Sequence, residues 1–424
     1  MQCLKRICLT FFTISIFFTQ NILSANEQST LEIIQDYVAT QRLPGVIFSE
    51  TTSQKNSHIT DGRRNIYHQE AIQKDELFPI ASLSKIFTSI LILQEIEMGK
   101  LSLHSKLKDI FHVRVHEDYE DLDIEEIMYH RGGFPMNEID STDLENYSKT
   151  RSDLTRFFLR HGPYHSLKTS NYSTYGFVAL GAILEHLENK SWEQIVTERL
   201  LKPLKLHSCR LPYDPSIASF PKSSKIPLLT DDDYKNMVFG HLKQNRKIDW
   251  ISGRIKENAH PPLDNPGAGL FCKIDDIHKF IQEQLSGYKI YLDSLEGKEN
   301  NLTQKIFQNI STYKYLFHSP QQNMQSISHW VLFSQQFNPQ KVFAACAYGS
   351  SGGTSIVTCF DLKQNKIASA FANAWSDRVF DELREILDTT FHNKLLLKKL
   401  NPYLLPLHSP SFMNSASKFS SERN

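Results

Sequence analysis

The chain has 424 residues, of which 40% are hydrophobic and 22% charged, so it is long enough for one large globular domain or two smaller ones. Lysine plus arginine equals aspartate plus glutamate, at 47 each, so no overall field favours nucleic acid or an anionic membrane. We therefore expect a small-molecule or peptide substrate and no nucleic-acid partner.

The first 25 residues have the pattern of a signal peptide. Lys5 and Arg6 precede an apolar run from Ile7 to Phe18, and the later Leu-Ser-Ala segment at residues 23–25 fits a small-residue cleavage site that ends at Ala25. The run is short for a membrane span, and an uncleaved anchor is the alternative. We expect cleavage near Ala25, export to the periplasm or the outside, and no stable membrane span in the mature chain.

Four cysteines follow the expected leader: Cys209, Cys272, Cys346 and Cys359. An exported chain can oxidise them, but four cysteines in this length are no disulfide scaffold, and separate small buried residues are the preferred interpretation. No two of them have the Cys-x-x-Cys spacing. We expect no metal site and no cofactor.

Hydrophobic periodicity predicts the order of the first elements. Apolar residues at helical spacing from residue 30 stop at Pro44 and Gly45, and residues 46–60 predict two strands around a polar turn. A wide apolar stripe then predicts a strongly buried helix that begins at or near Ser82 and ends at Gly99. Short helical patterns fill most of residues 101–260.

From residue 267 onward helix and strand patterns alternate. The chain predicts helices at 273–285 and 376–392, and strands at 329–337, 342–349 and 355–361. Strands at both chain ends predict an α/β (α+β) fold: one sheet flanked by helices, with a mainly helical subdomain at 101–260 inserted in a domain of residues 26–395. Residues 396–424 form a polar tail.

Two serines compete as a candidate nucleophile, and the first is Ser351. It is the centre of a Gly-x-Ser-x-Gly pattern at residues 349–353, the spacing of a nucleophile elbow. An elbow needs a helix directly after the serine, whereas residues 354–360 are β-branched and aromatic and predict a strand. We therefore disfavour Ser351.

The second candidate is Ser82, which forms a Ser-x-x-Lys pattern with Lys85. Residues i and i+3 share a helix face, and a desolvated lysine can act as the base that activates a serine. The spacing alone is weak, because a capping serine with a surface lysine has the same pattern. It recurs at Ser105/Lys108, Ser219/Lys222, Ser286/Lys289, Ser311/Lys314 and Ser415/Lys418. Only the Ser82 copy begins a long, uninterrupted apolar helix.

Residues 77–111 resemble the nucleophile helix of the β-lactamase-related serine hydrolases, which include class C β-lactamases, penicillin-binding DD-peptidases and many esterases. Residues 43–50, 127–135 and 267–280 are similar to further segments of that family, in the same order, and the resemblance extends from about residue 31 to about 387. It implies a β-lactamase/transpeptidase-like fold with an antiparallel sheet. It also implies that Ser82 is the nucleophile and Lys85 its partner.

The family's second motif, Tyr-x-Asn, aligns with Tyr172, Ser173 and Thr174. The resemblance implies that Tyr172 shuttles a proton between the nucleophile, the lysine and the leaving group. Thr174 stands where asparagine is usual, and Tyr-Ser-Thr is similar to the variant of the mitochondrial β-lactamase-like serine proteases. A hydroxyl is shorter than a carboxamide, which weakens a β-lactam interpretation.

The family's third motif aligns with residues 349–354, so that Ser350 stands where lysine or histidine is expected. Ser351 and Gly352 would then edge the substrate pocket. The resemblance implies an oxyanion hole formed by the backbone N–H groups of Ser82 and Gly353. A serine carries no charge, so we expect a neutral pocket edge that does not favour substrates recognised by a carboxylate.

Together these patterns predict an exported serine hydrolase. It would form an acyl-enzyme on Ser82, with Lys85 and Tyr172 as proton-transfer groups, and cleave an ester or a peptide or amide bond. Two alternatives stay open: a catalytically impaired family member that acts as a binding or scaffolding protein, and a β-lactamase or DD-peptidase proper.

Overall fold

The structure is a computed structural model of the chain. The residues that it describes are 24–136, 150–213, 220, 224–243, 251–255, 262–299, 304–319, 326–334, 342–376 and 378–391. Residues 1–23 of the expected leader and the expected tail at 396–424 lie outside this set, so leader and tail stay predictions. Among the described residues, no helix is long and apolar enough to cross a membrane.

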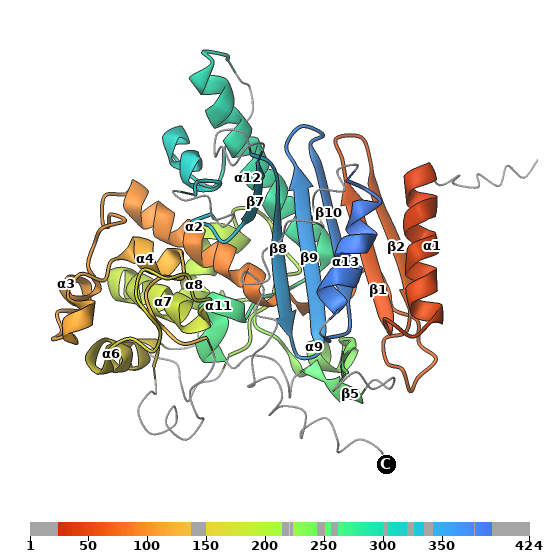
Figure 1. Cartoon of the computed structure of the whole chain (residues 1–424), viewed down its shortest axis with the longest axis horizontal. Helices are drawn as coiled ribbons and strands as arrows, with labels where there is room; N and C mark the ends of the chain where they lie inside the picture. The colour runs from red at the N-terminus through yellow and green to blue at the C-terminus, as the bar shows by residue number, and fades with distance from the viewer. Residues whose placement is uncertain are drawn as a thin grey trace, which may run out of the picture.

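A six-stranded antiparallel sheet in the order β2-β1-β10-β9-β8-β7 forms one side of the molecule (Figure 1). Its strands come from both chain ends, as the sequence predicts. They are β1 (Gly45–Thr51), β2 (Asn56–Gly62), β7 (Val331–Ser334), β8 (Val342–Ser351), β9 (Thr354–Asp361) and β10 (Lys366–Ala372). Of these six strands, the sequence patterns missed only β10. Alanine has a low β propensity, and it occupies the alternate positions Ala368, Ala370 and Ala372 of this strand.

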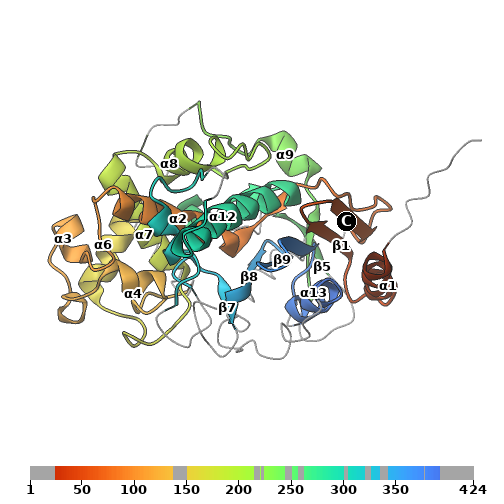
Figure 2. The same cartoon turned by 90° about the horizontal axis from the view of Figure 1, so that it is seen from above.

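Helices cover both faces of this sheet (Figure 2). Helix α12 (Ile274–Leu295) lies along one face, and α1 (Ala25–Ala39) and α13 (Val379–Asp388) lie along the other. Alternate residues of a strand enter different cores: Ile356 of β9 packs on the α12 side, while Val357 packs on the α13 side. This alternation decides which residues of β8 can reach the candidate site.

The segment between the first strands and α12 is mainly helical, as predicted for residues 101–260. Its helices are α2 (Ser84–Glu97), α3 (Leu107–Phe111), α4 (Ile124–Met128), α6 (Arg151–His161), α7 (Thr174–Glu188), α8 (Trp192–Val196), α9 (Asp231–Asn236) and α11 (Asn265–Ala268). Short helical turns are η1 (Ala81–Leu83), η2 (Glu117–Tyr119), η3 (Thr197–Leu201), η4 (Pro262–Asp264) and, after α12, η5 (Ile310–Tyr315). Two small strand pairs were not predicted: β3 (Phe78–Pro79) with β6 (Phe271–Cys272), and β4 (Phe239–Leu242) with β5 (Ile251–Arg254).

Helix α2 is buried from Ser84 to Glu95 and packs against α7 and α11. A helix that is apolar on nearly every side is buried by the protein and exposes no face to water. Polar side chains in its first turn therefore point into protein, which is how the fold desolvates Lys85.

The four cysteines form two disulfide bonds, which corrects the expectation that they are separate residues. Cys346 and Cys359 face each other across β8 and β9, and Cys209 pairs with Cys272 of β6. All four are buried, as predicted. The pairing follows from strand register, which places opposite side chains within bonding distance.

Candidate active site

Ser82 lies in the turn η1, directly before α2. Ala81 has a φ of 47°, in the left-handed region that residues with a side chain rarely adopt, so the chain turns sharply at the candidate nucleophile. Ser82 is partly exposed, while Lys85 is fully buried. One helical turn brings Lys85 Nζ to 3.3 Å from Ser82 Oγ, as the spacing predicts.

Lys85 is held by groups from two other segments. Its Nζ donates a hydrogen bond to the carbonyl of Gly267 (2.9 Å) and lies 3.4 Å from Thr174 Oγ1. Burial lowers the pKa of Lys85 from 10.5 to about 7, and the charge of Asp264 opposes that shift only in part. At neutral pH a large fraction of this amine is unprotonated and is able to accept a proton.

Tyr172 lies just before α7, whose N-cap is Ser173. Its hydroxyl donates a hydrogen bond to Ser82 Oγ at 2.7 Å. Burial raises the pKa of Tyr172 above its ordinary value, against the effect of the Ser82 hydrogen bond, so the phenol stays protonated at neutral pH. The structure therefore brings together Ser82, Lys85, Tyr172 and Thr174, which the sequence predicted as one site.

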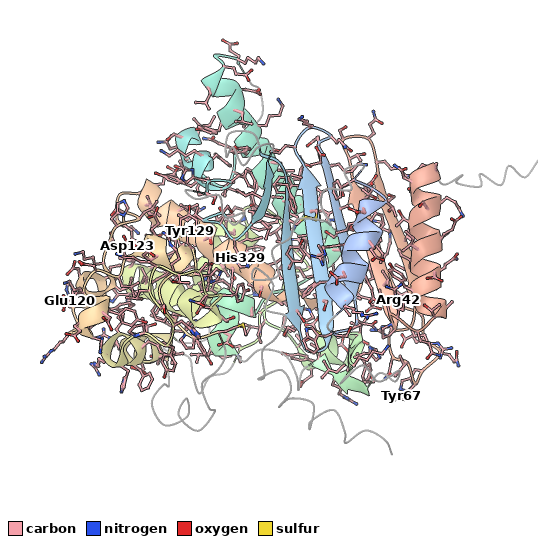
Figure 3. All side chains as sticks on the ribbon, in the orientation of Figure 1. Arg42, Tyr67, Glu120, Asp123, Tyr129 and His329 are labelled. Carbon is pink, nitrogen blue, oxygen red and sulfur yellow. A yellow bond between two sulfur atoms is a disulfide. The ribbon has the colours of Figure 1, made fainter. Side chains whose placement is uncertain are left out.

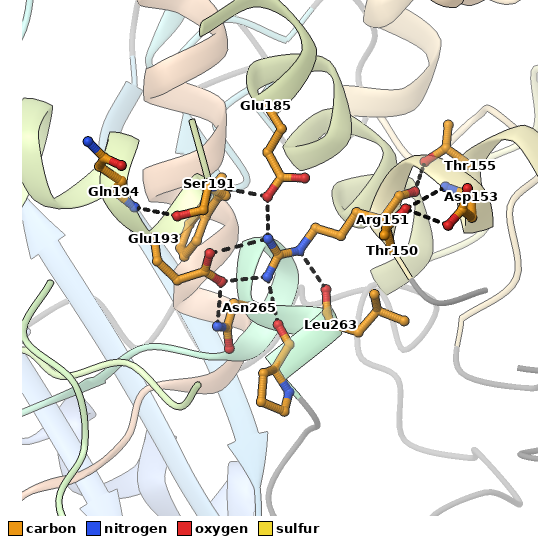
Figure 4. Close-up of polar contacts among 12 residues, drawn as sticks. Thr150, Arg151, Asp153, Thr155, Glu185, Ser191, Glu193, Gln194, Leu263 and Asn265 are labelled. Carbon is orange, nitrogen blue, oxygen red and sulfur yellow. Dashed lines mark hydrogen bonds and ion pairs between the residues drawn. The ribbon is translucent and has the colours of Figure 1, made fainter. Parts of the chain in front are cut away.

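A buried charge cluster fixes the segment that carries the Gly267 carbonyl (Figure 4). Arg151 forms ion pairs with Glu185 and Glu193, and its Nε donates to the carbonyl of Leu263 at 3.0 Å. Asn265 donates to Glu193 at 2.7 Å. The cluster anchors η4 and α11 against α6, α7 and α8, and no sequence motif indicated it.

A model of the Beta-lactamase family matches residues 31–390 of the chain. The chain belongs to the beta-lactamase family. One relative is Protein flp of Staphylococcus aureus (strain MW2), 26% identical over 233 residues that cover 54% of this chain and 43% of that protein. Another is a beta-lactamase of Escherichia coli (strain K12), 22% identical over 265 residues, 62% of either chain. The match thus spans less than two thirds of each relative.

A solved structure confirms the fold class expected for a beta-lactamase family member. The beta-lactamase/D-alanine carboxypeptidase from Pseudomonas syringae superimposes with a TM-score of 0.64 at 15% identity, and the match covers 88% of this chain and 99% of that one. At this identity the likeness shows the fold alone.

Gly349 is the residue of the third motif that lies against the nucleophile turn. A side chain at this position would place its Cβ 2.4 Å from the carbonyl oxygen of Ile80 and 3.2 Å from Leu83 Cδ1. Ile80 precedes the turn that holds Ser82, and Leu83 is the last residue of that turn. Only glycine lets β8 approach η1 so closely.

Ser350 points away from that face, contrary to the expectation that its hydroxyl stands at the lysine or histidine position. Tyr348 packs its ring on Phe380 of α13, on the far side of the sheet, and strand alternation gives Ser350 the same direction. Its hydroxyl donates to the carbonyl of Thr354 at 2.9 Å. On β8, the residues on the face toward the helical region are Ala345, Ala347, Gly349 and Ser351.

Gly352 and Gly353 form the two-residue turn between β8 and β9, with φ values of 59° and 77°. Ser351 is buried just before this turn, and a strand rather than a helix follows, so the elbow interpretation is wrong. The carbonyl of Gly353 accepts the N–H of His241 at 2.9 Å. These contacts tie Gly353 to β4 rather than to η1, where the expected oxyanion hole would need it.

Two histidines contact Tyr172 and were not predicted as site residues. The ring of His130 stacks on Tyr172 with centroids 4.6 Å apart, and that of His329 lies 5.7 Å from Tyr172. The sequence could have indicated His130 as a site residue, because residues 127–135 resemble a family segment that contains a histidine. No sequence pattern indicated His329, because only the fold brings it to Tyr172. Among the described residues, no group of three or more His, Cys, Asp or Glu side chains is placed to hold a metal.

Proposed function

We propose that the protein is a serine hydrolase that forms an acyl-enzyme on Ser82. The observation that carries this proposal is the convergence on Ser82 Oγ of a protonated phenol at 2.7 Å and a lysine amine at 3.3 Å whose pKa is about 7. A serine hydroxyl needs an adjacent base to act at neutral pH, and an amine with such a pKa is suited to that role.

In acylation the neutral Lys85 amine takes the proton of the Ser82 hydroxyl while Oγ attacks the substrate carbonyl carbon. The Tyr172 hydroxyl gives its proton to the leaving alcohol or amine and regains one from the Lys85 ammonium, which adjoins the same Ser82 oxygen. In deacylation a water molecule loses a proton to these groups, attacks the acyl carbon and releases the acid. Ser82 then regains its proton, and all groups return to their starting state.

We assign the oxyanion hole to the backbone N–H groups of Ser82 and Ser350, in place of Gly353. In a two-residue hairpin the residues that flank the turn, Ser351 and Thr354, form a hydrogen-bonded pair, and the next residue turns its N–H away from the partner strand. On that side β7 pairs with β8 only as far as Cys346. The N–H of Ser350 is therefore directed to the edge that adjoins η1.

The substrates that fit this site best are esters, amides or peptides without a carboxylate at the recognition point. Residues 342–354, which include the third motif, carry no charged side chain. A carboxylate-bearing substrate would lack an ionic partner from this strand. We favour an ester or neutral peptide over a β-lactam for the same reason.

The lack of a charged third-motif residue also favours a second candidate, a catalytically impaired protein that only binds its ligand. The intact contacts of Ser82, Lys85 and Tyr172 support the hydrolase instead. We further infer export, because the leader pattern and the two disulfide bonds both fit an oxidising compartment.

A fluorophosphonate probe separates the two candidates. We expect a single adduct on Ser82 that is absent in Ser82→Ala and strongly reduced in Lys85→Ala. A wild-type protein that is folded but does not react would support the binding protein. An adduct on Ser351 would refute the assignment of the nucleophile.

A further inference from the structure

His329 lies beside the edge of β8 that leads to the third motif, in which no residue is charged. It lies two residues before β7, whose first residue Val331 pairs with Cys346. His329 therefore adjoins the part of β8 that leads to Gly349. Figure 3 labels it at the boundary between the sheet and the helical region. Its exposed fraction is 7%, so it belongs to the wall of the site rather than to the surface.

A hydrogen-bonded chain links His329 to the second motif. The N–H of Ser173 donates to His130 Nδ1 at 3.0 Å, so this nitrogen carries no proton. In neutral His130 the proton is then on Nε2, which lies 3.2 Å from His329 Nδ1 and donates to it. The backbone of the second motif thereby sets the tautomers of both rings.

The two rings and Tyr172 pack as one unit. His130 stacks on Tyr172 with an interplanar angle of 23°, and His329 lies 5.3 Å from His130 and 5.7 Å from Phe177, centroid to centroid. Both histidines have left-handed backbone conformations, with φ of 57° and 69°. A residue with a side chain adopts this region only where the surrounding structure enforces it.

The pair is uncharged at neutral pH. Burial and, to a smaller extent, the nearby Lys85 lower the pKa of His130 to about 3; burial, His130 and Lys85 likewise hold the pKa of His329 well below its ordinary value. Among the described residues, Tyr172 is a further titratable group that packs against the pair. A neutral ring pair, unlike a cation, does not favour the phenolate form of Tyr172 and does not attract a carboxylate.

We propose that His329, through His130, replaces the charged third-motif residue as an uncharged positioning group for Tyr172, and that the enzyme therefore selects substrates without a carboxylate. This inference rests on the proposed acyl-enzyme chemistry. His329 orients the phenol that serves Ser82, and a cation in its place would convert the edge to one that accepts a carboxylate.

Kinetics with two p-nitrophenyl esters test the inference: one bears a free carboxylate and the other has the same group as its methyl ester. The wild type should favour the methyl ester by at least about tenfold in kcat/KM. His329→Phe keeps a ring and removes the hydrogen bond, so kcat for the methyl ester should fall about 10- to 100-fold with little change in KM. His329→Gln, which again accepts from His130, should restore part of kcat.

His329→Lys should move the kcat/KM ratio toward the carboxylate ester by about tenfold or more. His278→Phe is the matched control, because His278 is also buried, with a pKa of about 3, but contacts Thr51 and Ser369. His278→Phe should change the melting temperature. It should leave unchanged both the kcat/KM ratio of the two esters and the kcat for the methyl ester. Circular dichroism verifies folding, and if His329→Phe does not fold, the ratio measured for His329→Lys decides.

The outcomes separate this inference from the proposed function. A wild type that does not react with the fluorophosphonate probe rejects both. A reactive wild type that prefers the carboxylate ester, or whose ratio is unchanged in His329→Lys, rejects the role of His329 alone. So does an unchanged kcat in a folded His329→Phe.

Discussion

Lys85 combines complete burial with a hydrogen bond to a carbonyl and a place 3.3 Å from the candidate nucleophile. Burial favours the neutral amine, which has the lone pair that a general base needs. The neighbouring phenol of Tyr172 has its pKa raised by burial and keeps its proton. One environment therefore produces a base and an acid on either side of Ser82.

The pH dependence of acylation follows from the pKa of Lys85. Only the unprotonated amine can accept the Ser82 proton, so the rate should rise with pH through a midpoint near 7 and level off above it. Stopped-flow acylation by a neutral ester between pH 5 and 9 measures this. A rate that falls as pH rises through 7 would show that the charged amine is the active form.

Replacing Lys85 by methionine should stabilise the protein at pH 7 while abolishing acylation. The pKa is 10.5 in the unfolded chain and about 7 in the folded one, so wild-type stability increases as pH rises from 7 to 10.5. The shift costs at most about 5 kcal/mol at pH 7, and the hydrogen bond lost from Gly267 offsets about 1–3 kcal/mol. We expect a net gain of about 2–4 kcal/mol at pH 7, from the difference between these terms.

Denaturant unfolding at pH 7 and pH 10 checks this result. The advantage of Lys85→Met should shrink or reverse at pH 10, because this pH is close to the unfolded-state pKa of 10.5 and little energy is then needed to deprotonate the lysine on folding. An equal difference between the two proteins at both pH values would contradict the burial of an unprotonated amine.

The sequence predicted the site residues that belong to local motifs, and missed those that the fold alone brings near. Ser82 and Lys85 are one helical turn apart, so their contact was readable from spacing. His329 reaches Tyr172 only because β7 pairs with β8. The face of the sheet on which the Ser350 side chain lies depends on strand alternation after Gly349. Aligning the glycines of the third motif does not determine that face.

At the scale of elements, the Arg151 cluster joins α6, α7 and α8 to the segment that carries Gly267. Arg151→Met leaves the carboxylates of Glu185 and Glu193 buried without a counter-ion, so the free energy of unfolding should fall by about 3–5 kcal/mol. Guanidinium unfolding measures this loss. The double variant Arg151→Met/Glu193→Gln should recover part of it, because one of the two uncompensated charges is gone.

A double variant no more stable than Arg151→Met would show that the cost comes from lost packing instead of buried charge. The cluster was not predictable, because Arg151, Glu185 and Glu193 form no sequence motif and meet only after three helices pack. The helices themselves were predictable from their apolar spacing, as α2 and α7 show. Strand β10 was not predictable, because its alternating alanines have neither the hydrophobic pattern of a strand nor that of a buried helix.

At the scale of the whole molecule, two disulfide bonds close one long and one short loop of the chain. Cys209–Cys272 closes a separation of 63 residues and Cys346–Cys359 one of 13. Because a disulfide bond lowers the conformational entropy of the unfolded chain, we expect Cys209–Cys272 to stabilise the protein by about 4 kcal/mol and Cys346–Cys359 by about 3 kcal/mol. Dithiothreitol should therefore lower the melting temperature, and each paired replacement of cysteines by alanine should remove part of that sensitivity. An equal melting temperature with and without reductant would contradict the pairing.

The architecture as a whole was largely predictable, because strand patterns at both chain ends and a helical middle allow few arrangements. The resemblance of residues 31–387 to the β-lactamase-related serine hydrolases predicted that the sheet is antiparallel. The cysteine pairing was not predictable, since it needs the register of β8 against β9 and of β6 against the 209–211 segment.

The most direct test of the acyl-enzyme on Ser82 is time-resolved mass spectrometry after mixing the full chain with a p-nitrophenyl ester. We predict one added acyl group that maps to Ser82, appears in milliseconds to seconds and decays as the acid is released. It should be absent in Ser82→Ala and should form slowly, if at all, in Lys85→Met. Hydrolysis without a covalent intermediate, or an acyl group on another residue, would contradict the account.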